Sequence, residues 1–206
     1  MAPVAATVVG MKTFAVGLFA CAVLGGCVGS PPEPPPSPGT AHYQLTCDSP
    51  IGAVKTWMIY TVTASAEPMH ERQAVTYTLN APVAQVKSPV STDFRKSVVT
   101  FAIPSGLQVT GVSTTPATLD GFDGIDAHQD GANIIFTLTG DFPLDGTPHA
   151  VPTVVVTGVI TAAPGASVVW MTPTSIDGVA HAGIFGDQSS HCHFESPGPI
   201  WTSTVQ

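Results

Sequence analysis

The residues whose types could do chemistry gather near the carboxyl end of the chain. His191-Cys192-His193 sets two imidazoles two positions apart, with His181 and Asp187 a few residues before them. In a strand the two histidines would point to one face and Cys192 to the other. They could share a copper or zinc ion, which needs about three or four ligands, and His181 or Asp187 could join them. The alternative is two exposed histidines that flank a disulfide cysteine.

A second candidate is a run of four aspartates in a segment rich in turn residues: Asp120, Asp123, Asp126 and Asp130. Calcium takes about six to eight oxygen ligands, commonly from closely spaced carboxylates and carbonyls. The order of acids in an EF-hand loop is absent here, and Asp-Gly pairs form turns throughout this chain. We therefore expect residues 114–131 to form a solvated, turn-rich loop, with calcium binding as the alternative.

Motifs of nucleophilic catalysis are absent from the sequence. It contains no Gly-x-Ser-x-Gly, Ser-x-x-Lys or His-Glu-x-x-His, and no glycine-rich phosphate loop. Ser189-Ser190-His191 places a hydroxyl beside an imidazole, but closeness in sequence does not make a triad. The carboxylate pair of a glycosidase can come from distant parts of a chain, so sequence does not test for it. We expect a protein without catalytic activity and without a cofactor.

The cysteines indicate an oxidising compartment. Of the four, Cys47 and Cys192 lie near the two ends of the region after residue 40. The pair predicts a disulfide that closes a loop of about 145 residues, which the chain-entropy estimate values at about 4–5 kcal/mol. The alternative is a reactive thiol or a metal ligand at Cys192.

The first 27 residues have the layout of an export signal. Met11-Lys12 supplies a basic start, Thr13 to Leu24 is mostly apolar, and Leu24-Gly25-Gly26-Cys27 follows. This stretch resembles the lipobox of bacterial lipoproteins. The resemblance implies that residues 1–26 are removed and that Cys27 is lipidated, becoming the first residue of the mature protein. The alternative is an ordinary signal peptide with an incidental Cys27, and Met11 is a second candidate for the start.

Residues 27–40 form a proline-rich tether after the expected lipid site. Consecutive prolines favour polyproline II, a stiff spacer of about 3.1 Å per residue, although a plain disordered linker would serve equally well. Acyl chains on Cys27 would hold the protein lastingly at the outer face of the cell membrane. We therefore expect an extracytoplasmic protein that is attached to the membrane through its lipid.

The charge of the chain limits the classes of partner that it could bind. The chain has a formal net charge of −8, and charged residues make up 10% of it. Its longest basic run is Arg95-Lys96. A nucleic-acid reader needs a basic face, and so does a protein that docks on anionic lipid by charge. Both classes are disfavoured, so attachment to the membrane should come from the lipid.

Residues 41–206 predict a single all-β domain. Apolar residues alternate with polar ones at Tyr43, Leu45 and Cys47, and again at Val75, Tyr77 and Leu79. About nine or ten short strands favour an antiparallel β-sandwich, immunoglobulin-like in layout, with a barrel as the second choice. Composition and layout resemble the secreted β-sandwich domains of actinobacterial lipoproteins.

Three local expectations accompany this fold. Residues 82–86 are expected to form a short edge strand, and Ser91-Thr92-Asp93 to cap one helical turn through Lys96. Residues 200–205 are expected to close the sheet.

The sequence as a whole favours a non-catalytic, lipid-anchored domain with a binding or display role in the cell envelope. Its partner would be an envelope protein, the cell wall or a small apolar ligand. The alternatives are a carrier of an apolar molecule and a copper or zinc protein that uses His191 and His193. A large internal cavity would favour the carrier, because β-sandwiches and barrels can open an apolar interior.

Overall fold

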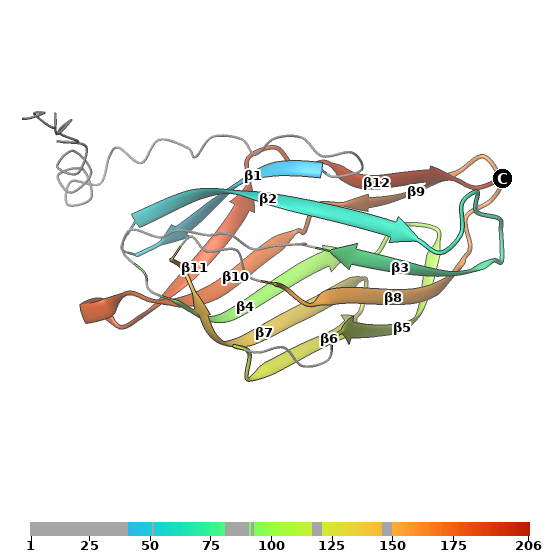
Figure 1. Ribbon diagram of the computed structural model, residues 1–206. Helices are drawn as coiled ribbons and strands as arrows, with labels where there is room; N and C mark the ends of the chain where they lie inside the picture. The colour runs from blue at the N-terminus through green and yellow to red at the C-terminus, as the bar shows by residue number, and fades with distance from the viewer. Residues whose placement is uncertain (1–40, 51, 81–90, 92, 117–120, 146–149) are drawn as a thin grey trace, which may run out of the picture.

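β-Strands make up almost all of the regular structure (Figure 1). The computed structural model describes residues 41–50, 52–80, 91, 93–116, 121–145 and 150–206. The expected leader (1–26), the tether with Cys27 (27–40) and the expected strand 82–86 lie outside these ranges. The elements are β1 (Ala41–Ser49), β2 (Gly52–Ala64), β3 (Ala74–Asn80), β4 (Asp93–Ala102), β5 (Leu107–Thr115), β6 (Gly124–Asp130), β7 (Asn133–Pro143), β8 (Thr153–Ile160), β9 (Ser167–Met171), β10 (Ser175–His181), the 3-10 turn η1 (Gly183–Phe185), β11 (Asp187–Phe194) and β12 (Pro199–Thr204).

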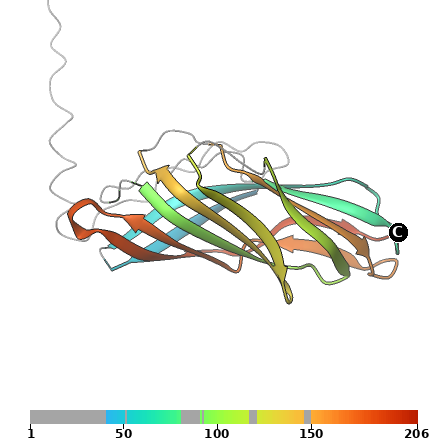
Figure 2. The same ribbon diagram turned by 90° about the horizontal axis from the view of Figure 1, so that it is seen from below.

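Ten of the strands form one antiparallel sheet in the order β5-β8-β3-β2-β1-β11-β10-β4-β7-β6. Its two edge strands, β5 and β6, come into contact with each other. The sheet therefore curls on itself until it is nearly barrel-shaped, and the strands run along an elongated body (Figures 1 and 2). The predicted antiparallel β-sandwich is confirmed, in a form close to the predicted second choice.

Among the described residues, the remaining two strands, β9 and β12, pair with each other and with no other strand. The expectation that residues 200–205 close the main sheet is therefore wrong. This pair instead contacts β2 and β4 of the large sheet. Its buried residues Val168, Trp170 and Ile200 join the common core. The pair thus fills the interior from one side, and its position is fixed by burial of apolar surface.

Two further local expectations are wrong for the same physical reason. The expected helical turn through Lys96 is wrong, because residues 93–96 begin β4, which pairs with both β7 and β10; residue 92 lies outside the described ranges. The expected turn-rich loop at 114–131 contains β6, which pairs with β7 along its whole length. In both places backbone hydrogen bonds to neighbouring strands outweigh a weak local preference.

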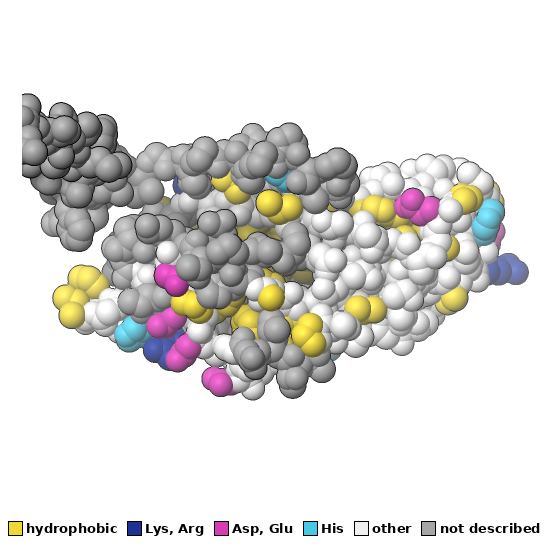
Figure 3. All heavy atoms as spheres, viewed as in Figure 1, with side chains coloured by type: hydrophobic (Ala, Val, Ile, Leu, Met, Phe, Trp, Pro, Cys, Tyr) yellow, Lys and Arg dark blue, Asp and Glu magenta, His cyan; other side chains and the backbone are white. Residues whose placement is uncertain are grey.

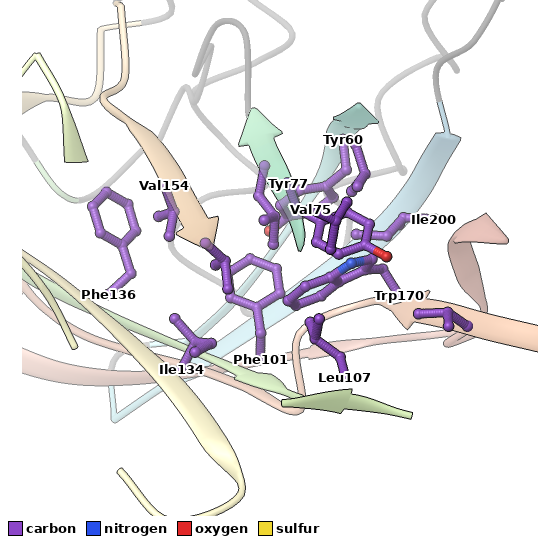
Figure 4. Packing of buried hydrophobic residues seen from close by; sticks show 14 of the residues in the cluster. Tyr60, Val75, Tyr77, Phe101, Leu107, Ile134, Phe136, Val154, Trp170 and Ile200 are labelled. Carbon is purple, nitrogen blue, oxygen red and sulfur yellow. The ribbon is translucent and has the colours of Figure 1, made fainter. Parts of the chain in front are cut away.

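The tightly packed end of the core is built around Trp170 (Figure 4). Its indole lies 5.4 Å from the Tyr77 ring, between centroids, and both side chains are fully buried. The Tyr77 hydroxyl donates to Met69 Sδ at 3.1 Å. On β3 the buried residues are Val75, Tyr77 and Leu79, which confirms the predicted alternation.

A disulfide joins Cys47 and Cys192, as the sequence predicts. The two residues lie directly opposite each other on the neighbouring strands β1 and β11. The bond therefore ties together two strands that are 145 residues apart in the chain.

Hydrogen bonds to the Glu195 carboxylate link β1, β2 and the end of β11 on the outer face. Glu195 Oε1 accepts hydrogen bonds from Lys55 Nζ at 2.5 Å and from Thr46 Oγ1 at 2.7 Å. These two bonds lower the pKa of Glu195 below its ordinary value of 4.5. The resulting stabilisation is present at neutral pH and is lost as the pH falls through the lowered pKa.

The disulfide generates the first prediction. Replacing both cysteines (Cys47→Ala with Cys192→Ala) should lower the free energy of unfolding by about 2–5 kcal/mol, because the unfolded chain gains freedom. Urea denaturation of the double variant measures this change. Wild-type protein held under reductant is the control and should behave in the same way. A double variant as stable as the oxidised protein would contradict the prediction.

Candidate functional site

An apolar cavity of about 170 Å³, partly open at its mouth, lies at the end of the sheet away from Trp170. Eight neighbouring strands of the curled sheet (β8, β3, β2, β1, β11, β10, β4 and β7) contribute residues to its wall. The large apolar residues of the lining are Leu45, Met58, Tyr60, Leu79, Phe94, Val99, Phe101, Phe122, Phe136, Leu138, Phe142, Leu144, Val151, Val154 and Ile176.

The cavity follows from how the sheet is filled. A barrel of about eight strands is just wide enough for its own side chains to fill, so a curled sheet of ten strands needs additional filling. The β9–β12 pair provides that filling at one end. At the other end, β3 pairs with β2 only along Thr61–Ala64. Within the described ranges, Gly52–Tyr60 of β2 pairs with β1 alone.

Small residues at inward-facing positions widen this end. Ser97, Gly178 and Ser190 line the cavity from three adjacent strands. At Gly178, a Cβ atom would lie 2.9 Å from Lys96 O and 3.1 Å from Phe94 Cε1. Any side chain there would therefore displace the Phe94 ring, so glycine at 178 is what lets this aromatic ring lie against β10.

Aromatic rings form much of the remaining wall. Phe122 and Phe142 pack with their centroids 5.6 Å apart. Deeper in the core, Tyr60 meets Phe101 edge to face at 6.1 Å. Such pairs hold each other in place beyond the effect of area burial alone. Packing between aromatic rings therefore fixes parts of the cavity wall.

One wall residue carries an unsatisfied polar atom. The Tyr60 hydroxyl is buried, and no group within the described ranges forms a hydrogen bond with it. Burial raises the pKa of this hydroxyl above its ordinary value of 10.0, so the group stays protonated and can donate. A buried donor without a partner costs about 1–3 kcal/mol. A hydrogen-bond acceptor on a bound molecule would remove that cost.

The disulfide belongs to the same wall, because Cys47 and Cys192 both line the cavity. Cys192 faces inward, whereas His191 and His193 are exposed on the other face of β11. The predicted alternation of this triplet is therefore confirmed. The alternative role of Cys192 as a free thiol or a metal ligand is wrong, because the residue is oxidised.

The histidines lie beside carboxylates on the outer surface. His191 Nδ1 is 2.6 Å from Asp177 Oδ1, and His193 Nδ1 is 3.5 Å from Asp48 Oδ2. His181 pairs with Asp187 instead of joining them, at 2.8 Å. In the part of the chain that the structure describes, no group of three potential metal ligands is brought together.

The other predicted candidates are also dispersed. Ser190 faces the cavity whereas His191 faces outward, so this adjacent hydroxyl and imidazole lie on opposite faces of β11. In β6, Asp126 Oδ2 pairs with His128 Nδ1 at 2.7 Å. Asp130 ends that strand, Asp123 precedes it, and Asp120 lies outside the described ranges.

Sequence reasoning missed the cavity itself. A signal was nevertheless present, because small or polar residues precede apolar ones at inward positions of β4 and β11. Ser97 sits between Arg95 and Val99, and Ser190 lies two positions before buried Cys192. Judging these positions requires the register of both neighbouring strands, which the sequence alone does not give.

Comparisons with known proteins give little about this site. No family model and no curated protein matches the chain. A protein from Corynebacterium diphtheriae, described as membrane anchored, is similar over 81% of this chain with 10% identity and a TM-score of 0.43. This chain spans only 37% of that protein's length.

Two solved structures from Clostridium perfringens are also similar. The cohesin module of a family 33 glycoside hydrolase matches over 72% of this chain and 98% of its own, with 9% identity and a TM-score of 0.41. The NetB toxin in its membrane-inserted form matches over 79% and 94%, with 7% identity and a TM-score of 0.28. Similarities this low do not indicate a shared function. Within the described residues, no helix has the length and apolarity needed to cross a membrane.

The unpaired hydroxyl generates a prediction about the ligand-free protein. Tyr60→Phe should raise the free energy of unfolding by about 1 kcal/mol, because it removes a buried donor that has no partner. Urea denaturation of delipidated protein measures the change.

Tyr77→Phe is the matched control, since its hydroxyl is bonded to Met69. That change should lower stability by about 0.5–1.5 kcal/mol. If Tyr60→Phe destabilises the protein as much as Tyr77→Phe does, the Tyr60 hydroxyl has a hydrogen-bond partner, which contradicts the prediction.

Proposed function

We propose that this chain is a lipid-anchored, extracytoplasmic protein that binds an apolar molecule in its apolar cavity and does no chemistry on it. The observation that carries the proposal is the apolar cavity of about 170 Å³ at one end of the core. Of the functions the sequence leaves open, carriage of an apolar ligand is the one that uses this cavity. A display role or an external metal site does not require it.

The size and lining of the cavity narrow the ligand class. An engineered protein cavity of about 150 Å³ takes up benzene, so this one is large enough for one ring or a short segment of an acyl chain. The wall favours an apolar group, and the Tyr60 hydroxyl favours one hydrogen-bond acceptor on it. The best candidate is therefore an apolar chain or ring that carries a carbonyl, ester or ether oxygen.

The proposed location rests on the amino-terminal residues. Leu24-Gly25-Gly26-Cys27 would direct lipidation of Cys27, and residues 27–40 would hold the domain outside the membrane. The Cys47–Cys192 disulfide supports export, because such bonds persist in oxidising compartments. With a net charge of −8, the folded surface would contribute little to membrane binding through charge.

Filling the cavity should weaken binding of an apolar molecule without unfolding the protein. Ser190→Leu places a larger apolar side chain in the cavity, because Ser190 lines it. The affinity of this variant for a small apolar fluorescent probe, 1-naphthylamine, should fall at least about tenfold, equivalent to 1.4 kcal/mol. Fluorescence titration of delipidated protein measures this affinity, and circular dichroism checks the fold.

Ser189→Leu provides the matched control, since the neighbouring Ser189 is exposed on the same strand. This control should keep its affinity within about twofold of wild type. Equal probe binding by the two variants would show that the probe does not occupy the cavity, and the proposed function would then be abandoned.

The anchor has its own test. Cys27→Ala should remove the acyl mass from the mature protein and move it to the aqueous phase of a Triton X-114 partition. Cys21→Ala, within the expected leader, should change neither the mature mass nor the partition. Intact mass spectrometry and the phase partition measure both variants. A Cys27→Ala protein with unchanged mass and partition would rule out lipidation at this residue.

A further inference from the structure

The tip between β10 and β11 exposes two neighbouring large apolar side chains. Ile184 is 96% exposed and Phe185 is 62% exposed. Among the described residues the only other exposed side chain of this kind is Met171, at 41%. Figure 3 shows the resulting apolar patch at the extremity where Figure 1 places η1. Isolated exposed apolar residues are ordinary, but an adjacent pair at a projecting tip needs an explanation.

The tip is held in this shape by hydrogen bonds. Ala182 N–H donates to Gly186 O at 2.9 Å, and Phe185 N–H donates to Ala182 O at 3.0 Å. Gly183 and Gly186 adopt φ values of 54° and 66°, which are accessible to glycine at little cost. Ala182 is itself buried. The backbone therefore holds Ile184 and Phe185 outward, and their exposure is built into the turn.

The chemistry of the tip suits an uncharged apolar surface. Residues 182–186 read Ala-Gly-Ile-Phe-Gly and carry no charge. The nearest titratable side chains on the hairpin, His181 and Asp187, pair with each other at its base. Short apolar segments of this kind enter the interface of a bilayer, where burying apolar area favours binding. Because the protein carries a charge of −8, a zwitterionic surface fits it better than an anionic one.

The proposed anchor brings the tip within reach of a bilayer. Residues 27–40 can span about 43 Å in polyproline II at about 3.1 Å per residue. From Ala41 along β1, and then along β11 to the tip, the distance is about 40 Å at about 3.3 Å per strand residue. Lipid on Cys27 and a tip in contact with the same membrane are therefore compatible, with little length to spare.

The tip also adjoins the cavity. Gln188 lines the cavity and donates from Nε2 to Phe185 O at 2.7 Å. Other lining residues, including Ser49 and Ala180, lie at the same end of their strands as the tip. The cavity thus extends to the end of the sheet from which Ile184 and Phe185 project.

We propose that the β10–β11 tip inserts into the surface of the membrane that carries the lipid anchor, and so holds the cavity end against the bilayer for ligand exchange. The role in exchange rests on the proposed function. The insertion itself depends only on the tip and on the anchor that brings it to the membrane.

Spin labels on the full lipidated protein test the insertion. A nitroxide is attached to Ile184→Cys, and in a separate protein to Met171→Cys as the control in β9. Both proteins are reconstituted into phosphatidylcholine vesicles. The label at 184 should lose access to a water-soluble nickel chelate and gain access to oxygen, whereas the label at 171 should stay in water. The proposal is overturned if the label at 184 remains accessible to the nickel chelate. It is also overturned if the label is shielded by a protein and gains no access to oxygen.

Deleting residues 31–38 from the tether supplies a second test of the same step. The remaining six residues would span about 19 Å in polyproline II. The label at 184 should then return to water while the protein stays on the vesicles. Continued insertion of the label in this deletion variant would contradict the proposed geometry.

Transfer kinetics separate this proposal from the proposed function. Ile184→Ser with Phe185→Ser should slow transfer of the naphthylamine probe from protein to vesicles at least about tenfold, because two apolar side chains no longer enter the bilayer. Its equilibrium affinity should not change, since neither residue lines the cavity. Unchanged transfer would overturn the role in exchange. Absence of probe binding in the wild type would instead refute the cavity function and leave the result from the spin labels standing.

Discussion

The interior of a ten-stranded sheet that curls on itself must be filled, and this protein fills it unevenly. At one end the β9–β12 pair inserts Trp170 against Tyr77, and Met69 caps the tyrosine hydroxyl. No comparable plug from the described residues occupies the other end, where the wall surrounds about 170 Å³. The cavity and its wall result from this difference in filling, because one curled sheet has a packed half and a hollow half.

The hollow half needs support that packing does not supply. There the strands β1, β2 and β11 are held from both faces. The Cys47–Cys192 disulfide lies in the cavity wall, and Glu195 binds Lys55 and Thr46 on the outer face. A cavity with a wall fixed in this way can stay open without collapsing, which lowers the cost of admitting a ligand.

Much of the fold could be predicted from the sequence, because alternation reports directly on which face of a strand is buried. Val75, Tyr77 and Leu79 are buried as expected, and the predicted disulfide joins two cysteines near the two ends of the domain. The misread segments were those where pairing decides the structure. Asp93 and its neighbours favour a helix cap locally, yet β4 lies between β7 and β10.

The candidate site was harder to predict from the sequence, because it is an apolar cavity and not a cluster of reactive side chains. His191 and His193 attract attention in the sequence, but they lie on the outer face beside carboxylates. Nothing in the sequence distinguishes Ser97, Gly178 and Ser190. Their role in lining the cavity becomes visible only when the strand register places them side by side. Exposure of Ile184 and Phe185 likewise depends on a turn whose direction the sequence does not state.

Native mass spectrometry of the protein, extracted from its own membranes in mild detergent, tests the central claim most directly. Our account predicts a mature protein with acyl mass on Cys27 and, in addition, one non-covalent equivalent of an apolar molecule that organic solvent removes. Ser190→Leu should lose that second mass and keep the first. A wild-type protein without any non-covalent mass, and with no uptake of an apolar probe afterwards, would contradict the account and leave the cavity without a ligand.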